Sequence, residues 1–297
     1  MKTLRRYQLL VIIALVLAAK LVSSLLFSSP STNTLGLTAL QATSTPAPTA
    51  TPRPAPTATV VAGDPIPIKP LTDLTSLEAT VKINVNGLLN GERAQGDLTA
   101  LLNTNDQNKS QIKVTGGLLG DVVAQVGGAV VGLFAPREVN IYKVPEGTYV
   151  VVNGLFPVCV KPNAPKATEA LDKLSPQSLM ETLTGSEVAR GKFVGNETVN
   201  GIPAKHYVIN GDAFLAAAQK SSDPNLRTFG EALWSAEDAD LFISADGGYP
   251  ISFRGSYSGE FEPLKFQGDF DVQIDLTSVN TNPTVELPSA CNNPISQ

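Results

Sequence analysis

The sequence predicts an α+β fold in which a curved antiparallel β-sheet, a half-barrel, wraps around a few helices. Segments of alternating apolar and polar residues recur between residues 77 and 276, which is typical of strands with one wet face. Asn200-Gly201 separates two runs rich in Val, Phe, Tyr and Ile, the pattern of a hairpin turn. Helix-like segments interrupt the strands, so both kinds of element are expected to share one core.

The first 30 residues have the pattern of an export signal. Three basic residues precede an apolar run, Leu9 to Ala19, which Lys20 separates from a second run, Leu21 to Phe27. This stretch is nearly long enough to span a bilayer, so we expect a retained signal anchor, with a cleaved signal peptide as the alternative. Because the basic flank stays inside, the rest of the chain is expected outside the cytoplasm, anchored to the cytoplasmic membrane or secreted if the signal is cleaved.

Residues 31–70 are predicted to form a Thr/Pro/Ala-rich extracytoplasmic linker. From Ser44 to Pro70 a proline occurs every few residues, which favours an extended, semi-rigid spacer rather than a core element. The remaining residues, 71–297, are long enough for one large β domain with its own core.

Charge composition argues against a nucleic-acid partner. The chain has 22 Lys and Arg residues and 27 Asp and Glu residues, a net charge of −5, and no basic cluster beyond the N-terminus. Binding to nucleic acid needs a concentrated positive surface, which this sequence does not predict.

The two cysteines, Cys159 and Cys291, share no metal-ligand spacing with each other or with the single histidine. In an oxidising compartment they are expected to form one disulfide, which would connect the end of the chain to its middle. Two buried free thiols are the alternative.

Alternating residues predict the main strands. Leu77 to Val85, Gly96 to Leu101, Ser110 to Val114 and Gly268 to Leu276 each present one apolar face. The hairpin Glu187 to Asn210 is expected at the centre of the sheet, with the other strands on either side.

Three segments are expected to cover the apolar face of the sheet. Leu118 to Phe134 is apolar almost all round but rich in glycine, so it is expected as a lid, an ordinary buried segment or a membrane-inserted segment. Thr168 to Leu183 contains the helix start Ser175-Pro176. In Asp212 to Trp234, Asp212 is expected to cap a helix.

Large aromatic residues are few and small aliphatic residues are many, so the space between sheet and helices is expected to be incompletely filled. Such an apolar hollow would suit an acyl chain, because each buried CH₂ contributes about 0.8 kcal/mol. A well-packed core is the alternative. The apolar periodicity selects these residues as the lining of a lipid cavity: Leu119, Val122, Val126, Val130, Phe134, Leu179, Leu183, Phe214 and Leu215.

Five segments occur in a characteristic order: GERAQGDL (91–98), VNIYKVPEGTYVV (139–151), LSPQSLMETL (174–183), GNETVNGIPAKHY (195–207) and DLFISADGGYPISF (240–253). Their order resembles the LppX/LprAFG family of envelope lipoproteins, which is related in fold to LolA and LolB. This resemblance implies a half-barrel closed by helices around an apolar cavity for lipid or lipidated cargo. The family is usually anchored through an N-terminal lipidated cysteine, and here no cysteine precedes Cys159, so attachment would depend on the N-terminal helix.

No catalytic or metal-binding motif is evident, and neither a cofactor nor a metal is expected. His206 is the single histidine, and no Ser or Cys nucleophile is placed with it by a known motif. Asp269, Asp271 and Asp275 alternate along one strand and are interpreted as a solvated face rather than a calcium site.

The sequence therefore predicts a membrane-tethered extracytoplasmic protein that binds or transports lipid or lipoprotein. The alternative is a non-enzymatic sensory or scaffolding module that contacts another envelope protein. An enzyme of hydrolase type is not expected.

Overall fold

The structure, a computed structural model, describes residues 63–71, 74–107, 109–121, 136–154, 156–161, 188–261 and 265–296. The predicted N-terminal anchor, the linker up to residue 62, most of the insert 118–134 and the whole insert 168–183 lie outside the described residues.

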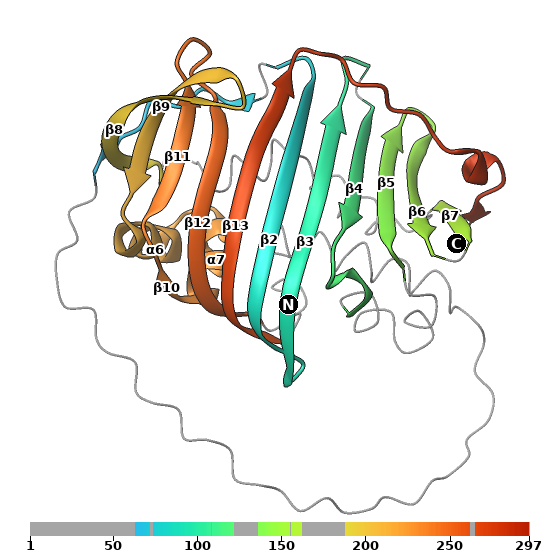
Figure 1. The fold of residues 1–297 in the computed structure, drawn as a ribbon, viewed down its shortest axis with the longest axis horizontal. Helices are drawn as coiled ribbons and strands as arrows, with labels where there is room; N and C mark the ends of the chain where they lie inside the picture. Colours follow the sequence, from blue (N-terminus) through green and yellow to red (C-terminus); the bar gives the residue numbers. More distant parts are fainter. Residues whose placement is uncertain are drawn as a thin grey trace, which may run out of the picture.

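The described strands form one open, mostly antiparallel sheet (Figure 1). Its strand order is β1-β8-β9-β11-β12-β13-β2-β3-β4-β5-β6-β7-β14, with β10 paired to β12, and only the β7–β14 pairing is parallel. The sheet does not close on itself, which agrees with the predicted antiparallel fold class. The strands are β1 (Asp64–Pro65), β2 (Leu77–Leu89), β3 (Glu92–Thr104), β4 (Ser110–Thr115), β5 (Glu138–Val144), β6 (Gly147–Asn153), β7 (Pro157–Lys161), β8 (Arg190–Val199), β9 (Ile202–Ile209), β10 (Leu233–Ala236), β11 (Ala239–Ser244), β12 (Pro250–Phe261), β13 (Phe266–Val279) and β14 (Ile295–Ser296).

Two Asn-Gly pairs set the register of two hairpins. Asn90 and Gly91 connect β2 to β3, and Asn200 and Gly201 connect β8 to β9. All four residues have positive φ, between 52° and 84°, as a two-residue turn that follows the sheet twist requires. The predicted hairpin is therefore confirmed.

The predicted position of this hairpin is wrong. The β8–β9 pair lies near one edge of the sheet, where only β1 follows it, and the centre is formed by β13 and β2. Local turn chemistry specifies which strands pair through the turn, but the pairing of β2 with β13 depends on residues far apart in sequence.

The insert expected at 212–234 forms two helices, α6 (Gly211–Lys220) and α7 (Pro224–Ala232), which lie behind the sheet in Figure 1. The expected cap at Asp212 is also wrong, because the Oδ1 atom of Asn210 accepts the hydrogen bond from the Ala213 amide, at 3.0 Å. Asp212 instead lies in the first turn, where its charge favours the helix N-terminus.

The face of the sheet against which α6 and α7 pack is here called the inner face, and apolar side chains predominate on it. One row of directly paired residues crosses eleven strands of this face, from β8 to β7. Because side chains alternate between the two faces of a strand, the opposite or outer face receives the polar residues. The row consists of Phe193, Tyr207, Leu241, Phe253, Ile274, Val81, Ala100, Val114, Val139, Val152 and Val158.

A row of small residues lets four neighbouring strands approach one another closely near the β2–β3 hairpin turn. Gly259, Gly268, Gly87 and Ala94 are paired side by side on the inner face of four strands. A Cβ atom at Gly268 would lie 2.5 Å from the Cα atom of Gly87, and one at Gly87 would collide with the carbonyl oxygen of Gln267. Neighbouring backbones therefore approach each other more closely than side chains would permit.

The end of the chain crosses back over the outer face of β5, β6 and β7. The predicted disulfide between Cys159 and Cys291 is present, with a sequence separation of 132 residues. It joins β7 to the short 3₁₀ helix Ser289–Asn292, and β14 then pairs with β7. The resulting second core is separate from the main one and contains Tyr142, Val144, Tyr149, Val151, Cys159, Val285 and Cys291.

Among the helices in the described ranges, none has the length and apolar character needed to span a bilayer.

Replacement of Gly87 by Ala is expected to destabilise the protein by about 2–3 kcal/mol, because the new methyl group would collide with the backbone of β13. Gly195→Ala is the matched control, since Gly195 also lies in a strand and no atom lies within 4 Å of its missing Cβ. Chemical denaturation of both full-length variants checks this. Equal stability of the two variants would contradict the proposed close approach.

Loss of the disulfide through Cys291→Ser is expected to cost roughly 2–5 kcal/mol, because the bond closes a long loop in the unfolded chain. Amide hydrogen exchange should accelerate first in β14 and in the amides of β7 on the edge that pairs with β14, while the amides of β2 and β13 remain protected. Uniform acceleration throughout the sheet would show instead that the C-terminal segment is not a separate cooperative unit.

Candidate functional site

The inner face carries a cluster of aromatic rings where α6 and α7 meet the sheet. Phe214 from α6 and Phe229 from α7 contact Tyr257 of β12, with ring centroids 5.8 Å and 5.6 Å away. Phe229 also contacts Phe261 and Phe270. The helices therefore hold to the sheet through aromatic packing, each close pair contributing about 0.5–1.5 kcal/mol beyond the area it buries.

The two helices pack tightly against each other. A Cβ atom at Gly230 of α7 would lie 2.6 Å from the Gln219 amide of α6, and the Gln219 side chain donates a hydrogen bond to the Gly230 carbonyl oxygen at 3.1 Å. The α6–α7 pair is thus one packing unit on the inner face of β12.

Three of the nine predicted cavity residues are described. Phe214 is buried in the aromatic cluster, Leu215 is partly buried against the main core, and Leu119 is buried in that core near the end of β4. The other six predicted lining residues lie outside the described residues, so the proposed lining as a set stays a prediction. They are Val122, Val126, Val130, Phe134, Leu179 and Leu183.

Tyr257 is the buried polar group that the sequence did not reveal. Its side chain is 3% exposed, and its hydroxyl is the buried side-chain atom in the described part of the chain that has no hydrogen-bond partner. Burial raises the pKa of this phenol, so the group is neutral and retains its proton. A buried hydroxyl without a partner costs about 1–3 kcal/mol. Strand alternation in the sequence indicates only that Tyr257 is on the inner face, and it does not show whether the hydroxyl has a hydrogen-bond partner.

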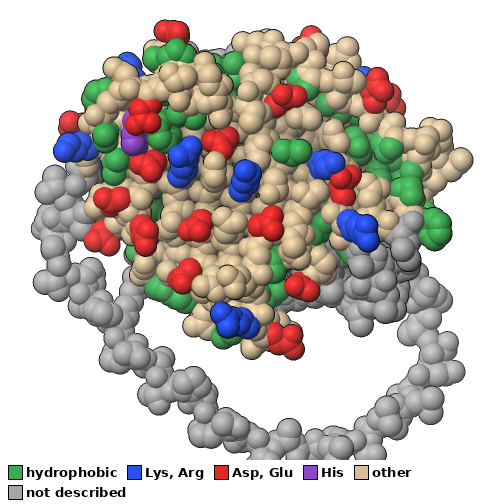
Figure 2. Space-filling model, in the orientation of Figure 1, with side chains coloured by type: hydrophobic (Ala, Val, Ile, Leu, Met, Phe, Trp, Pro, Cys, Tyr) green, Lys and Arg blue, Asp and Glu red, His purple; other side chains and the backbone are tan. Residues whose placement is uncertain are grey.

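The outer face is polar and carries charges of both signs. Figure 2 shows acidic and basic side chains interspersed over the viewed face. On β12, three outer-face serines each donate to an aspartate on β13, at 2.7–2.8 Å. The predicted aspartate row therefore serves as a cross-strand hydrogen-bonding ladder. The pairs are Ser252 with Asp275, Ser256 with Asp271 and Ser258 with Asp269.

An open hollow of about 490 Å³ lies over the outer face of β13, β2 and β3. It is not the predicted apolar cavity, because six of its nine lining residues carry amide or carboxylate groups and none is among the predicted lining residues. Such groups favour a polar or cationic molecule over a hydrocarbon. The lining residues are Asn84, Val85, Asn86, Gln95, Gly96, Asp97, Asp269, Phe270 and Asp271.

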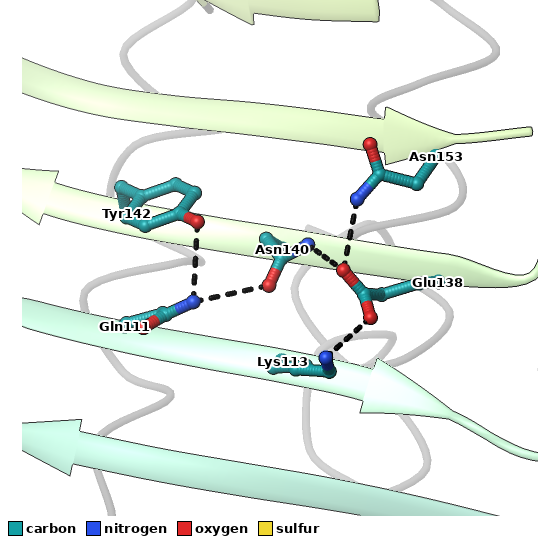
Figure 3. Close-up of polar contacts among 6 residues, drawn as sticks. All are labelled: Gln111, Lys113, Glu138, Asn140, Tyr142 and Asn153. Carbon is teal, nitrogen blue, oxygen red and sulfur yellow. Dashed lines mark hydrogen bonds and ion pairs between the residues drawn. The ribbon is translucent and has the colours of Figure 1, made fainter. Parts of the chain in front are cut away.

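Glu138 organises a polar network on the outer face of β4, β5 and β6 (Figure 3). Its Oε1 atom accepts hydrogen bonds from Asn140 at 2.7 Å and from Asn153 at 2.8 Å, and its Oε2 atom forms an ion pair with Lys113. Gln111 extends the network by donating to the Oδ1 atom of Asn140.

The net effect of these contacts lowers the pKa of Glu138. Partial burial by itself raises this pKa, but the hydrogen bonds from Lys113, Asn140 and Asn153 and the Lys113 charge together outweigh it. For Tyr142, burial raises the pKa and the negative charge of Glu138 raises it further. Gln111 also donates to the Tyr142 hydroxyl at 3.1 Å. The network holds three strands in register and shows no reactive group.

His206 links three strands on the outer face near β8. Its Nδ1 atom lies 2.8 Å from Glu197 of β8, and its Nε2 atom lies 2.7 Å from Asp240 of β11. The imidazole stacks on Phe242 at 4.4 Å between ring centroids, and the Arg254 guanidinium lies over the same phenyl ring. Every polar atom of the ring is thus held by a neighbour, which favours a structural role.

No group of three or more His, Cys, Asp or Glu side chains in the described ranges is placed to hold a metal ion. The described geometry therefore offers an apolar inner face with one buried donor, and an outer face of paired polar side chains.

The fold and these two faces define an open antiparallel β protein with few described helices. No family model matches the chain, and no curated protein matches it. Several solved structures align with this chain at low similarity. In the complex of Pseudomonas aeruginosa MucA and MucB, the matching chain has 13% identity and a TM-score of 0.29, over 74% of this chain and 60% of that one.

Two further solved structures have comparable scores. An outer membrane lipoprotein-sorting protein domain from Vibrio parahaemolyticus matches at 6% identity and a TM-score of 0.24, over 73% of this chain and 90% of that chain. A DUF1329 family protein from Desulfovibrio piger matches at 11% identity and a TM-score of 0.23, over 73% of this chain and 89% of that chain. At these scores we draw no function or partner from the likeness.

Glu138→Gln is expected to reduce stability at neutral pH by about 1 kcal/mol, because the charged hydrogen bonds become neutral. The lowered pKa fixes the sign of the pH dependence. The stabilisation is complete above the ordinary carboxyl pKa and is lost as pH falls through the lower folded-state value. Denaturation of both proteins at neutral and strongly acidic pH checks this, and the stability difference should vanish in acid. A difference that is independent of pH would contradict a role for the Glu138 charge.

Proposed function

We propose that this chain is a membrane-tethered, extracytoplasmic protein that binds or transports a lipid or the acyl part of a lipoprotein on the inner face of its sheet. It acts as a carrier or receiver and not as an enzyme. In this proposal the sheet is the half-barrel of a LolA-like fold.

The observation that carries the proposal is the apolar row across eleven strands of the inner face. In this proposal the acyl chain packs along this row, where burial of each CH₂ would favour binding by about 0.8 kcal/mol. The described helices α6 and α7 pack over β12 on this face, where they contact β10 and β12.

Membrane tethering follows from the sequence of the first 30 residues. The basic flank and the apolar stretch Leu9 to Phe27 favour a retained anchor, and the proline-rich segment Ser44 to Pro70 would hold the β domain away from the bilayer. The disulfide supports an oxidising compartment outside the cytoplasm.

One observation supports a second candidate function, the binding of another envelope protein. One edge of β8 pairs with β9. On its other edge only Arg190 and Gly191 have a partner, β1, and no other described strand pairs there. Phe193 and Val194 are 49% and 55% exposed there. An open strand edge with apolar side chains can accept an extended segment of a partner.

The test of the lipid proposal uses the full chain. Organic extraction followed by mass spectrometry should reveal co-purified lipid, and a fluorescent fatty acid should bind saturably. Ala100→Trp would fill the inner face and is expected to weaken this binding about tenfold, because the indole occupies the space of the acyl chain.

Leu101→Trp is the matched control, because Leu101 is the next residue of β3 and lies 41% exposed on the outer face. Its binding should equal that of the wild type. Absence of both co-purified lipid and probe binding in the wild-type chain would remove the proposal and leave the protein-binding candidate.

A further inference from the structure

The hollow on the outer face is a groove that crosses β13, β2 and β3 between two rows of polar side chains. Its volume of about 490 Å³ is within the range of about 300–1,000 Å³ that is usual for small-molecule sites. Phe270, Val85 and Gly96 lie between the rows and alternate to the inner face, so backbone forms the floor of the groove. The first row consists of Asp271, Asn84 and Asp97, and the second of Asp269, Asn86 and Gln95.

The amide side chains in this groove have no partners of their own. In the serine–aspartate ladder and in the Glu138 network, polar groups of the outer face bond to one another. Within the part of the chain that the structure describes, by contrast, the side-chain amides of Asn84, Asn86 and Gln95 form no hydrogen bond. Each of these exposed amides therefore offers two N–H donors and one carbonyl acceptor to a ligand.

The carboxylates of the groove are held in place and still have acceptor capacity. Asp269 and Asp271 each accept a hydrogen bond from a serine of β12, at 2.7 Å and 2.8 Å. The Oδ1 atom of Asp97 accepts from the Gly117 amide at 3.3 Å. A carboxylate has two oxygens that together accept several hydrogen bonds, so one bond leaves the others available. The acceptors are thus oriented before a ligand arrives, which lowers the cost of binding.

The mixture of donors and acceptors selects the class of ligand. A cation such as an amine only donates, so it would leave the amide N–H groups of the groove without acceptors. An anion only accepts, and the lining contains three carboxylates and no Lys or Arg, which would repel it. A hydroxyl group both donates and accepts. An uncharged molecule with several hydroxyl groups therefore matches both the amides and the carboxylates.

We propose that the groove across β13, β2 and β3 binds an uncharged sugar chain, held between the two rows of amide and carboxylate side chains. Neighbouring strands are about 4.8 Å apart, so a groove over three strands is about 10 Å long, enough for a short oligosaccharide lying across them. The groove is on the face opposite the proposed lipid surface. The inference therefore goes beyond the proposed function and does not rest on it.

The experiment screens the full-length protein by saturation-transfer NMR against neutral trisaccharides of glucose, mannose, galactose and N-acetylglucosamine. Spermidine is the cationic control and trigalacturonate the anionic control. At least one neutral trisaccharide should bind saturably, and neither charged control should displace it. If none of the four trisaccharides binds, or if spermidine displaces the bound sugar, the inference is refuted.

Two substitutions at Asn84 separate the ligand classes. Asn84→Ala removes one unpaired amide and is expected to weaken sugar binding about tenfold, as the loss of one or two hydrogen bonds would give. Asn84→Asp keeps the size of the side chain but replaces the N–H donors by a further carboxylate, so it should weaken sugar binding to a similar extent. A cationic ligand would instead bind Asn84→Asp more tightly than the wild type.

Asn103→Ala is the matched control, because Asn103 is an amide on the outer face of β3 that does not line the groove. It should bind the sugar as the wild type does, and equal melting temperatures of the variants would show that each is folded. Equal binding by Asn84→Ala and Asn103→Ala would place the sugar elsewhere and refute the groove. Failure of the fatty-acid probe to bind would remove the lipid proposal and leave the sugar site standing.

Discussion

The pairing of β2 with β13 is the interaction on which the rest of the structure depends. It joins the first long strand, Leu77–Leu89, to the last, Phe266–Val279, along nearly their whole lengths. The strands β3 to β7 extend the sheet on one side of this pair, and β12 to β8 extend it on the other. Closure of so long a loop costs entropy, which the inner residues Ala79, Val81 and Ile83 help to offset by their burial.

This central pair also fixes how the two faces of the sheet differ. Register across β2 and β13 places an apolar residue beside an apolar residue on the inner face at every second position, and the row through Val81 and Ile274 continues to β8 and β7. The outer face must then satisfy its polar groups locally. It does so by three means: a serine–aspartate ladder, the amide network around Glu138, and the imidazole of His206 between two carboxylates.

The outer face of β5 to β7 is an exception, because Tyr142, Tyr149 and Val151 make it apolar there. The C-terminal segment covers this surface, and the disulfide holds the segment in place. On the inner face the opposite exception occurs, since Tyr257 places a hydroxyl among phenyl rings. A polar atom without a partner is tolerated at a cost, and such costs are concentrated at functional positions.

The sequence by itself predicted the strands with clear alternation, the Asn200-Gly201 turn and the disulfide, because alternation, turn chemistry and a pair of cysteines are local or simple signals. It predicted a helical insert near 212–234 but neither its division into two helices nor its Asn210 cap. It indicated Phe214 as inward-facing and did not indicate Tyr257 or the Glu138 network. Only the tertiary structure decided that β2 and β13 form the centre and the β8–β9 hairpin an edge. Long-range register depends on which side chains meet across the sheet, and a local pattern does not contain that information.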